Sequence, residues 1–130
     1  MIPAVEPLEC VAFMLVDGDR LLVEKRSATK KLLPGAIAVP GGHLEQDEDL
    51  ETALLRELSE ELDITPQRFS YVCTLLHKAE EYRRIHYFVI DSWLGELATN
   101  EAESLQWIPL DDLSVLDLEI DILAVQTYLQ

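Results

Sequence analysis

The spacing of apolar residues along the chain predicts six strands. In the first of them, Val11, Phe13 and Leu15 fall on one face, and the Asp-Gly-Asp triplet at 17–19 then marks a hairpin turn. The Pro-Gly-Gly run at 40–42 is expected to end the third strand. The strands are predicted at residues 9–16, 21–26, 37–39, 69–77, 85–93 and 105–108.

One helix is predicted between these strands and another at the end of the chain. Leu54, Leu58 and Leu62 recur every four residues, which gives the first helix an apolar stripe. This helix is expected to end near Asp63, because the Thr-Pro pair that follows disfavours helical backbone. Helical spacing returns at 118–129. The order strands, helix, strands, helix predicts an α/β fold with a mixed sheet covered by helices.

Composition agrees with a single domain and restricts the classes of partner. The chain has 130 residues, 48% of them hydrophobic, so we predict one domain over residues 1–130 with an ordinary core. Its formal net charge is −15, from 25 acidic and 10 basic residues, which argues against a nucleic-acid partner. The same charge would repel a phosphate compound unless a cation mediates the contact. Because no apolar run approaches the ~18 residues of a membrane span, no membrane partner is expected.

The start of the chain and its two cysteines bear on the cellular compartment. Residues 1–6 have neither the basic stretch nor the apolar run of a secretory signal. Cys10 and Cys73 lie in apolar stretches far apart in sequence, which favours two buried thiols over a disulfide. We therefore expect a cytoplasmic protein.

Three carboxylates on the first helix give the clearest chemical signal. Glu57, Glu60 and Glu61 lie at i, i+3 and i+4, so they share one helix face. Each like-charge pair costs roughly 0.2–0.5 kcal/mol on a bare helix. A hard divalent cation such as Mg²⁺ would offset that repulsion. Taken alone, the same spacing also fits a solvated acidic face.

The residues around this cluster resemble the Nudix box, whose pattern is G-x5-E-x7-R-E-U-x-E-E-x-G-U, with U an apolar residue. Asp63 departs from the pattern, because it stands where the family has glycine. The early hairpin, the Pro-Gly-Gly run and residues 107–110 also resemble the family, so the resemblance implies the Nudix fold, a mixed β-sheet sandwiched between α-helices. The matching residues are Gly42, Glu48, Arg56, Glu57, Leu58, Glu60, Glu61 and Ile64.

The resemblance implies a metal-dependent hydrolase of diphosphate linkages. Arg56 would pair with Glu48 or Glu57 and fix its orientation. Either Glu57 or Glu61 would accept the proton of the attacking water. The cofactor implied is Mg²⁺, or Mn²⁺ in its place. The residues implied in metal binding are Gly41 (through its carbonyl), Glu57, Glu60, Glu61 and Glu101, of which Glu101 also fits a solvated loop position.

Two departures from the family pattern concern the backbone around the box. Asp63 would have to take the left-handed conformation that glycine usually provides at a helix end, at a cost near ~1 kcal/mol. Asp47 stands where a glycine is common before Glu48, and it either alters the loop or adds a carboxylate near the metal. Neither change removes a proposed ligand.

The remaining charged and aromatic residues are less informative. Arg26 ends a strand that leads toward the box and is a candidate phosphate contact, although a solvated position fits equally well. A plain surface role is favoured for Arg83 and Arg84, although contacts with substrate or across a dimer are also possible. The three histidines lack metal-ligand spacing and are expected to be structural. The strand aromatics are expected in the core, although one of them could line a base pocket.

The short chain favours a MutT-like hydrolase of nucleoside di- or triphosphates. An ADP-ribose or nucleotide-sugar pyrophosphatase is the alternative among enzymes. A non-catalytic nucleotide-sensing module is the alternative outside them, but such modules usually lose the box carboxylates that this chain keeps. The partner expected is a small nucleotide, and the chain would act as a monomer or homodimer.

Overall fold

The strand β1 (Leu8–Asp17) is buried on both faces and forms the centre of the fold. Val11, Phe13 and Leu15 point to one face, as predicted, and their cluster includes the apolar side of the first helix. Met14 and Val16 belong to a second cluster on the opposite face. Because both faces are covered, the strand is a nearly continuous apolar run rather than an alternating one. The structure is a computed structural model that describes residues 6–130.

The elements follow the predicted order with one additional short strand, and most strands are longer than predicted. The two late strands form a long hairpin, because their pairing extends well beyond the apolar segments. In chain order the elements are β1 (Leu8–Asp17), β2 (Arg20–Lys25), β3 (Ile37–Ala38), β4 (Gly41–His43), α1 (Leu50–Leu62), β5 (Thr65–Lys78), β6 (Tyr82–Leu94), β7 (Ser104–Pro109) and α2 (Glu119–Leu129).

The strands form one mixed sheet around β1. The strand order is β3-β2-β1-β6-β5, with β4 added on β1 and β7 added on β2. β1 and β6 are parallel, and the other pairs are antiparallel. On its other edge β1 pairs with β4 through residues 10–12 and with β2 only through Val16 and Asp17. The sheet therefore splays open between β2 and β4.

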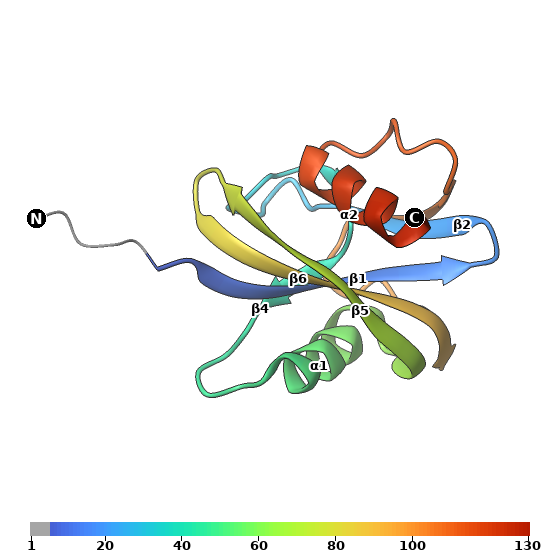
Figure 1. The fold of residues 1–130 in the computed structure, drawn as a ribbon, viewed down its shortest axis with the longest axis horizontal. Helices are drawn as coiled ribbons and strands as arrows, with labels where there is room; N and C mark the ends of the chain where they lie inside the picture. Colours follow the sequence, from blue (N-terminus) through green and yellow to red (C-terminus); the bar gives the residue numbers. More distant parts are fainter. Residues whose placement is uncertain (1–5) are drawn as a thin grey trace, which may run out of the picture.

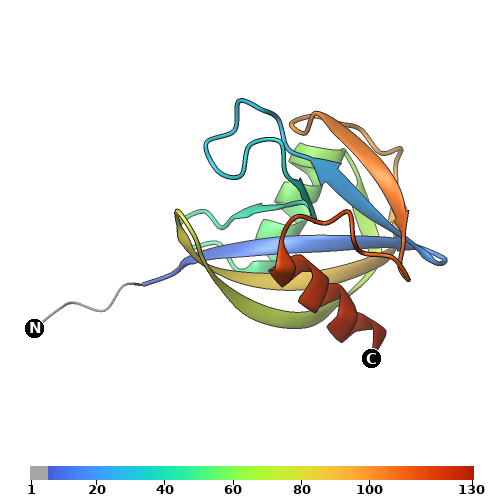
Figure 2. The ribbon, with the colours of Figure 1, turned by 90° about the horizontal axis from the view of Figure 1, so that it is seen from above.

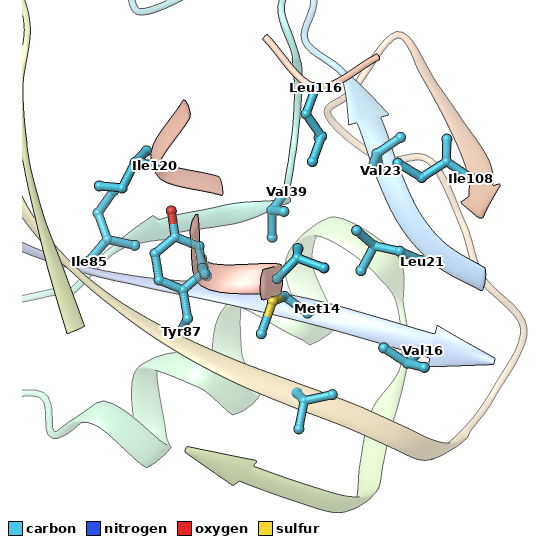
Figure 3. Packing of buried hydrophobic residues seen from close by; sticks show 14 of the residues in the cluster. Met14, Val16, Leu21, Val23, Val39, Ile85, Tyr87, Ile108, Leu116 and Ile120 are labelled. Atoms are coloured by element: carbon cyan, nitrogen blue, oxygen red, sulfur yellow. The ribbon is translucent and has the colours of Figure 1, made fainter. Parts of the chain in front are cut away.

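The two helices cover opposite faces of this sheet (Figures 1 and 2). The predicted stripe Leu54, Leu58 and Leu62 on α1 is fully buried in the cluster that holds Phe13. On the other face α2 packs over a cluster that includes Met14. Figure 3 labels Ile120 of α2 among the side chains of this cluster. The predicted arrangement of a mixed sheet between helices is confirmed.

The run at 40–42 does not simply end a strand, which corrects the sequence prediction. Gly41 and Gly42 begin β4, which pairs with β1. The pairing brings two backbones together, since a Cβ on Gly41 would lie 2.3 Å from the carbonyl oxygen of Val11. Pro66, expected to mark a break after the helix, lies in β5 at the sheet edge, where a missing N–H is tolerated.

Both ends of α1 are set by aspartates. The Asp49 side chain accepts a hydrogen bond of 2.8 Å from Thr52 N and caps the first turn. At the other end Asp63 is left-handed, with φ 60° and ψ 35°, as predicted for the glycine position of the box. Asp47 is also left-handed, with φ 63°, so the loop keeps a glycine-like backbone there.

Both cysteines are free thiols, as predicted. Cys10 is buried and Cys73 is half-buried, and burial raises the pKa of the Cys10 thiol to about 11. The expectation about a secretory signal rests mainly on residues 1–5, which lie outside the described part of the chain.

Within residues 6–130, no helix is both long enough and apolar enough to cross a membrane.

Replacing Asp63 with glycine is expected to stabilise the protein. The left-handed backbone at this position is strained for an aspartate and not for glycine, although glycine also loosens the unfolded chain. We expect Asp63→Gly to raise the free energy of unfolding by about 0.5–1 kcal/mol in urea denaturation. Asp63→Ala should lower it, and a less stable glycine variant would contradict the assignment.

Candidate active site

Arg56 lies at the centre of the acidic site and connects three segments. Its Nε and Nη2 atoms each donate to one oxygen of Glu48 at 2.8 Å. Its Nη1 donates to Glu57 Oε1 at 2.8 Å and to Glu60 Oε2 at 3.1 Å, and Nη2 also donates to the His43 carbonyl at 3.0 Å. The pairing lowers the pKa of Glu48 to about 2. The guanidinium therefore ties α1 to β4 and to the loop between them.

Glu57 is pressed against β4, and Gly42 makes the contact sterically feasible. A Cβ at Gly42 would lie 2.3 Å from the Glu57 carboxylate carbon. Glu57 is 8% exposed, and this burial raises the pKa of its carboxyl against the opposing effect of Arg56. The glycine that begins the box is thus required by the approach of a carboxylate.

Glu61 and Glu24 are two further acids withdrawn from solvent. Glu61 Oε2 is buried and has no hydrogen-bond partner among the described residues. Burial, followed by the charges of Glu24, Glu57 and Glu101, raises the pKa of Glu61 to about 9. Glu24 is 6% exposed, and burial raises its pKa to about 7. Without a cation, this part of the site therefore holds protons near neutral pH.

The connection between β6 and β7 brings Glu101 to the same place. Asn100 N donates to the Glu61 carbonyl at 3.2 Å, and Asn100 Nδ2 donates to the Glu60 carbonyl at 3.0 Å. These bonds fix the loop to the end of α1. Glu101 Oε2 lies 3.4 Å from Lys30 Nζ, so the β2–β3 loop meets the β6–β7 connection here (Figure 2).

The acids open onto a cleft of about 540 Å³, which is in the range of small-molecule sites. Half of the chain's ten basic residues line it, although the whole chain is strongly acidic. The cleft therefore brings basic side chains and carboxylates together, although the overall charge gave no indication of a basic region. The basic residues in its wall are Arg26, Lys30, Lys31, Arg56 and Arg83.

Two of these basic residues differ in how well the sequence predicted them. Arg26 lines the cleft, but its Nε donates to the Leu32 carbonyl at 3.0 Å and its Nη1 lies 3.6 Å from Glu24 Oε1. Its role as a phosphate contact stays a prediction. For Arg83 a plain surface role was favoured over a substrate contact, but its place in the cleft wall favours the alternative. Its Nη2 lies 2.8 Å from His77 Nδ1.

The histidines each have a polar neighbour, which agrees with their predicted structural role. His43 contacts the Glu81 carboxylate. His86 lies 2.8 Å from both Thr74 Oγ1 and Glu9 Oε1.

The far end of the cleft contains a buried acid that the sequence reasoning missed. Asp121 on α2 is 3% exposed and accepts hydrogen bonds from Tyr87 OH at 2.6 Å and from Val39 N at 3.0 Å. Burial raises its pKa to about 6. In Figure 3 the Tyr87 ring lies in the core next to Ile85. The only sequence signal for Asp121 was its place, with Glu119, at the start of an apolar helical stretch.

The donor atoms of the site fit a hard divalent cation. The box carboxylates Glu57, Glu60 and Glu61, with Glu101 and the Gly41 carbonyl, would supply oxygens only. The orphaned Glu61 Oε2 and the mutual repulsion around it are what a cation would relieve. Across residues 6–130, no group of three or more acidic, histidine or cysteine side chains stands in an arrangement that could hold a metal ion. Arg56 holds one oxygen each of Glu57 and Glu60.

Comparison with known proteins agrees with the fold and the box. The NUDIX domain model matches residues 7–126. The 8-oxo-dGTP diphosphatase of Escherichia coli is 28% identical over 102 residues, 78% of each chain. The CTP pyrophosphohydrolase of the same organism is 32% identical over 103 residues, 77% of this chain and 74% of that one.

Solved structures show the same architecture. A MutT NUDIX hydrolase from Burkholderia pseudomallei superposes with a TM-score of 0.85 at 26% identity, covering 95% of this chain and 98% of that chain. The NUDIX domain of Shewanella oneidensis NrtR, solved with ADP ribose, superposes with a TM-score of 0.79 at 19% identity, which shows a shared fold. It covers 96% of this chain and 88% of that chain.

The match over residues 7–126, together with the box acids on α1, places the chain in the Nudix hydrolase family. Within that family it is a MutT-like pyrophosphohydrolase.

Alanine should lower the activity at one of the two adjacent glycines of β4 and the stability at the other. Gly42→Ala displaces only the flexible Glu57 carboxylate, so we expect a folded protein whose hydrolysis rate falls about 100-fold. Gly41→Ala meets the Val11 backbone and should cost about 1–3 kcal/mol of unfolding free energy. Thermal denaturation and pyrophosphate release separate the two, and an active Gly42→Ala variant would contradict the placement of Glu57.

Glu61→Gln should stabilise the metal-free protein, and more so at high pH. The folded-state pKa of Glu61 is raised, so ionising it costs stability once the pH rises above its unfolded value, up to about 9. Measured in EDTA, the gain in unfolding free energy should grow from less than about 1 kcal/mol at pH 5 to about 2 kcal/mol or more at pH 9. Glu51→Gln, on an exposed position of the same helix, is the control. An equal gain at both pH values would exclude this account.

Proposed function

We propose that the protein hydrolyses the diphosphate linkage of nucleoside triphosphates or closely related nucleotides, with Mg²⁺ or Mn²⁺ as cofactor. The observation that carries the proposal is that the box carboxylates and half of the chain's basic residues line one cleft. Anionic oxygens of a polyphosphate need positive charge, whereas a divalent cation needs carboxylates. The names of the two E. coli relatives support a nucleoside triphosphate as substrate.

The acids around Arg56 have two roles: one of them holds the guanidinium in place, and the others are oriented by it. Glu48 accepts a two-pronged hydrogen bond from Arg56 and keeps the guanidinium in place. Arg56 in turn orients Glu57 and Glu60 toward the cleft. Glu57, Glu60, Glu61, Glu101 and the Gly41 carbonyl would hold the cation. When bound, Mg²⁺ supplies charge neutralisation and lowers the pKa of a water molecule.

Glu61 is the better placed of the two candidate bases. Glu57 Oε1 accepts a hydrogen bond from Arg56, which reduces its basicity, whereas Glu61 Oε2 accepts none. Burial makes the Glu61 carboxylate a stronger base than a solvent-exposed one. Glu61 would therefore take the proton of the attacking water. Lys30 and Lys31, which line the cleft from the β2–β3 loop, would bind phosphate oxygens.

A nucleotide panel tests the proposal directly. The wild type, incubated with Mg²⁺ and separately with dGTP, 8-oxo-dGTP, CTP and ADP-ribose, should release pyrophosphate from a triphosphate, and EDTA should abolish the release. Glu60→Gln removes one proposed ligand and is expected to lower the rate at least about 10-fold. Product chromatography should show the nucleoside monophosphate.

Three results would count against it. No turnover over the whole panel, or a Glu60→Gln variant as active as the wild type, would remove the catalytic assignment. Turnover of ADP-ribose alone would replace the triphosphate with the alternative substrate class. Glu51→Gln, outside the cleft, controls for loss of an acidic charge on α1.

A further inference from the structure

Arg83 and Arg84 are adjacent arginines on β6 that point to opposite faces of the sheet. Side chains alternate along a strand, so Arg83 shares a face with Ile85 and Tyr87, whereas Arg84 shares a face with Phe88. Ile85 and Tyr87 belong to the cluster under α2, and Phe88 belongs to the cluster with α1. Arg83 therefore lines the cleft together with Ile85 and Tyr87, and Arg84 lies outside it.

The guanidinium of Arg83 has no carboxylate partner among residues 6–130. Its hydrogen bond there runs from Nη2 to His77 Nδ1 at 2.8 Å, across the β5–β6 pair. Arg84 Nη1, by contrast, pairs with Glu9 Oε2 at 2.8 Å. Three of the other four basic residues in the cleft wall also have carboxylate partners. Since a guanidinium carries five N–H donors, Arg83 keeps most of its donors for another acceptor.

His77 holds the Arg83 guanidinium without neutralising it. Because an arginine can only donate, His77 Nδ1 is the acceptor, and the imidazole is neutral in this arrangement. Burial and the Arg83 charge both lower the pKa of His77, which favours the neutral ring. The guanidinium is thus positioned on a strand inside the sheet, between β1 and β5, with its positive charge uncompensated.

The end of the cleft around Arg83 is mostly apolar, unlike the end that holds the box acids. Cys10 and Ile85, which are paired across β1 and β6, form its floor. Leu32 and Leu33 of the β2–β3 loop line both the cleft and a smaller hollow beside Arg83. A mostly apolar surface with one hydrogen-bonding cation suits a heteroaromatic ring better than it suits a phosphate group.

The sheet register places Arg83 well away from the proposed cation. Gly41 is paired with Ala12, and Ala12 with Tyr87, so these residues form one row across β4, β1 and β6. Arg83 precedes Tyr87 by two alternate positions on the same face, so its backbone is roughly 16 Å from that of Gly41, at about 3.3 Å per residue and about 4.8 Å per strand. A diphosphate group bound to the cation is much shorter than this span. The base of the same nucleotide is the part that extends toward Arg83.

We propose that Arg83 binds the base of the nucleotide, where its guanidinium donates to a ring carbonyl oxygen and favours carbonyl-bearing bases over adenine. The inference rests on the proposed function, because it requires a nucleotide in the cleft. Adenine has no carbonyl oxygen and presents an amino group, which is a donor and would oppose the guanidinium. Asp121, the buried acid at this end, already accepts hydrogen bonds from Tyr87 and Val39. Two competing accounts are that Arg83 only braces His77 and that it binds an outer phosphate.

Base preference in turnover separates a base contact from a structural role. Hydrolysis of dGTP, CTP and dATP with Mg²⁺ is measured for the wild type, Arg83→Gln, Arg83→Lys and Arg84→Gln. Arg83→Gln should lower kcat/KM for dGTP and CTP about 10- to 100-fold, mainly through KM, because the contact is remote from the reacting atoms. The rate with dATP should change little. Arg84→Gln removes the same charge from the opposite face and should behave as the wild type does.

Product binding separates a base contact from a phosphate contact without relying on turnover. Deoxyguanosine monophosphate keeps the base, whereas pyrophosphate lacks it. In calorimetric titrations with Mg²⁺, Arg83→Gln should weaken binding of the monophosphate about tenfold or more and leave pyrophosphate binding unchanged. Arg83→Lys, which can still donate to His77, covers the case of a poorly folded glutamine variant and should also show a reduced preference for dGTP over dATP.

The possible failures are distinguishable. If Arg83→Gln weakens pyrophosphate binding instead, or slows all three nucleotides equally, the inference is overturned and the proposed function stands. If the wild type binds the monophosphate through Arg83 but hydrolyses none of the nucleotides, the proposed function alone fails. A wild type that neither binds nor hydrolyses any of these compounds would overturn both.

Discussion

The site depends on one guanidinium that holds like charges together. Arg56 donates to Glu48, Glu57 and Glu60 and to the His43 carbonyl, so four groups from the box share one cation. Without it these acids would repel one another and separate. Its planar guanidinium can donate to both oxygens of Glu48 at once, and a lysine ammonium group cannot match this geometry. The same bonds close the loop between β4 and α1, so the local fold and the acid arrangement have a common cause.

The cleft reverses the charge pattern of the chain as a whole. A formal charge of −15 suggests a protein that repels phosphates, yet half of its basic residues gather around one cavity. The acids in that cavity are partly buried, and burial disfavours their ionised forms. A divalent cation would compensate the carboxylates of the cleft, and a polyphosphate would compensate its basic side chains. Electrostatic complementarity here is a property of the cleft and not of net charge.

The sequence predicted most of the fold because its apolar pattern is strong. The stripe on α1 and the odd-numbered face of β1 were both read correctly, since burial imposes those periods directly. β4 was missed because two glycines usually interrupt a strand, whereas here they admit the backbone of β1 and the carboxylate of Glu57. A surface role was favoured for Arg83 because its place in the cleft depends on the β5–β6 hairpin extending past the apolar segments.

The sequence by itself determined the family, the helix that carries the acids and the left-handed turn at Asp63, because each depends on residues close together in the chain. Only the tertiary structure decided which distant residues join them. Glu101 and Asp121 reach the cleft from a loop and the last helix. Their places in the cleft result from packing between elements, which a local sequence pattern does not predict.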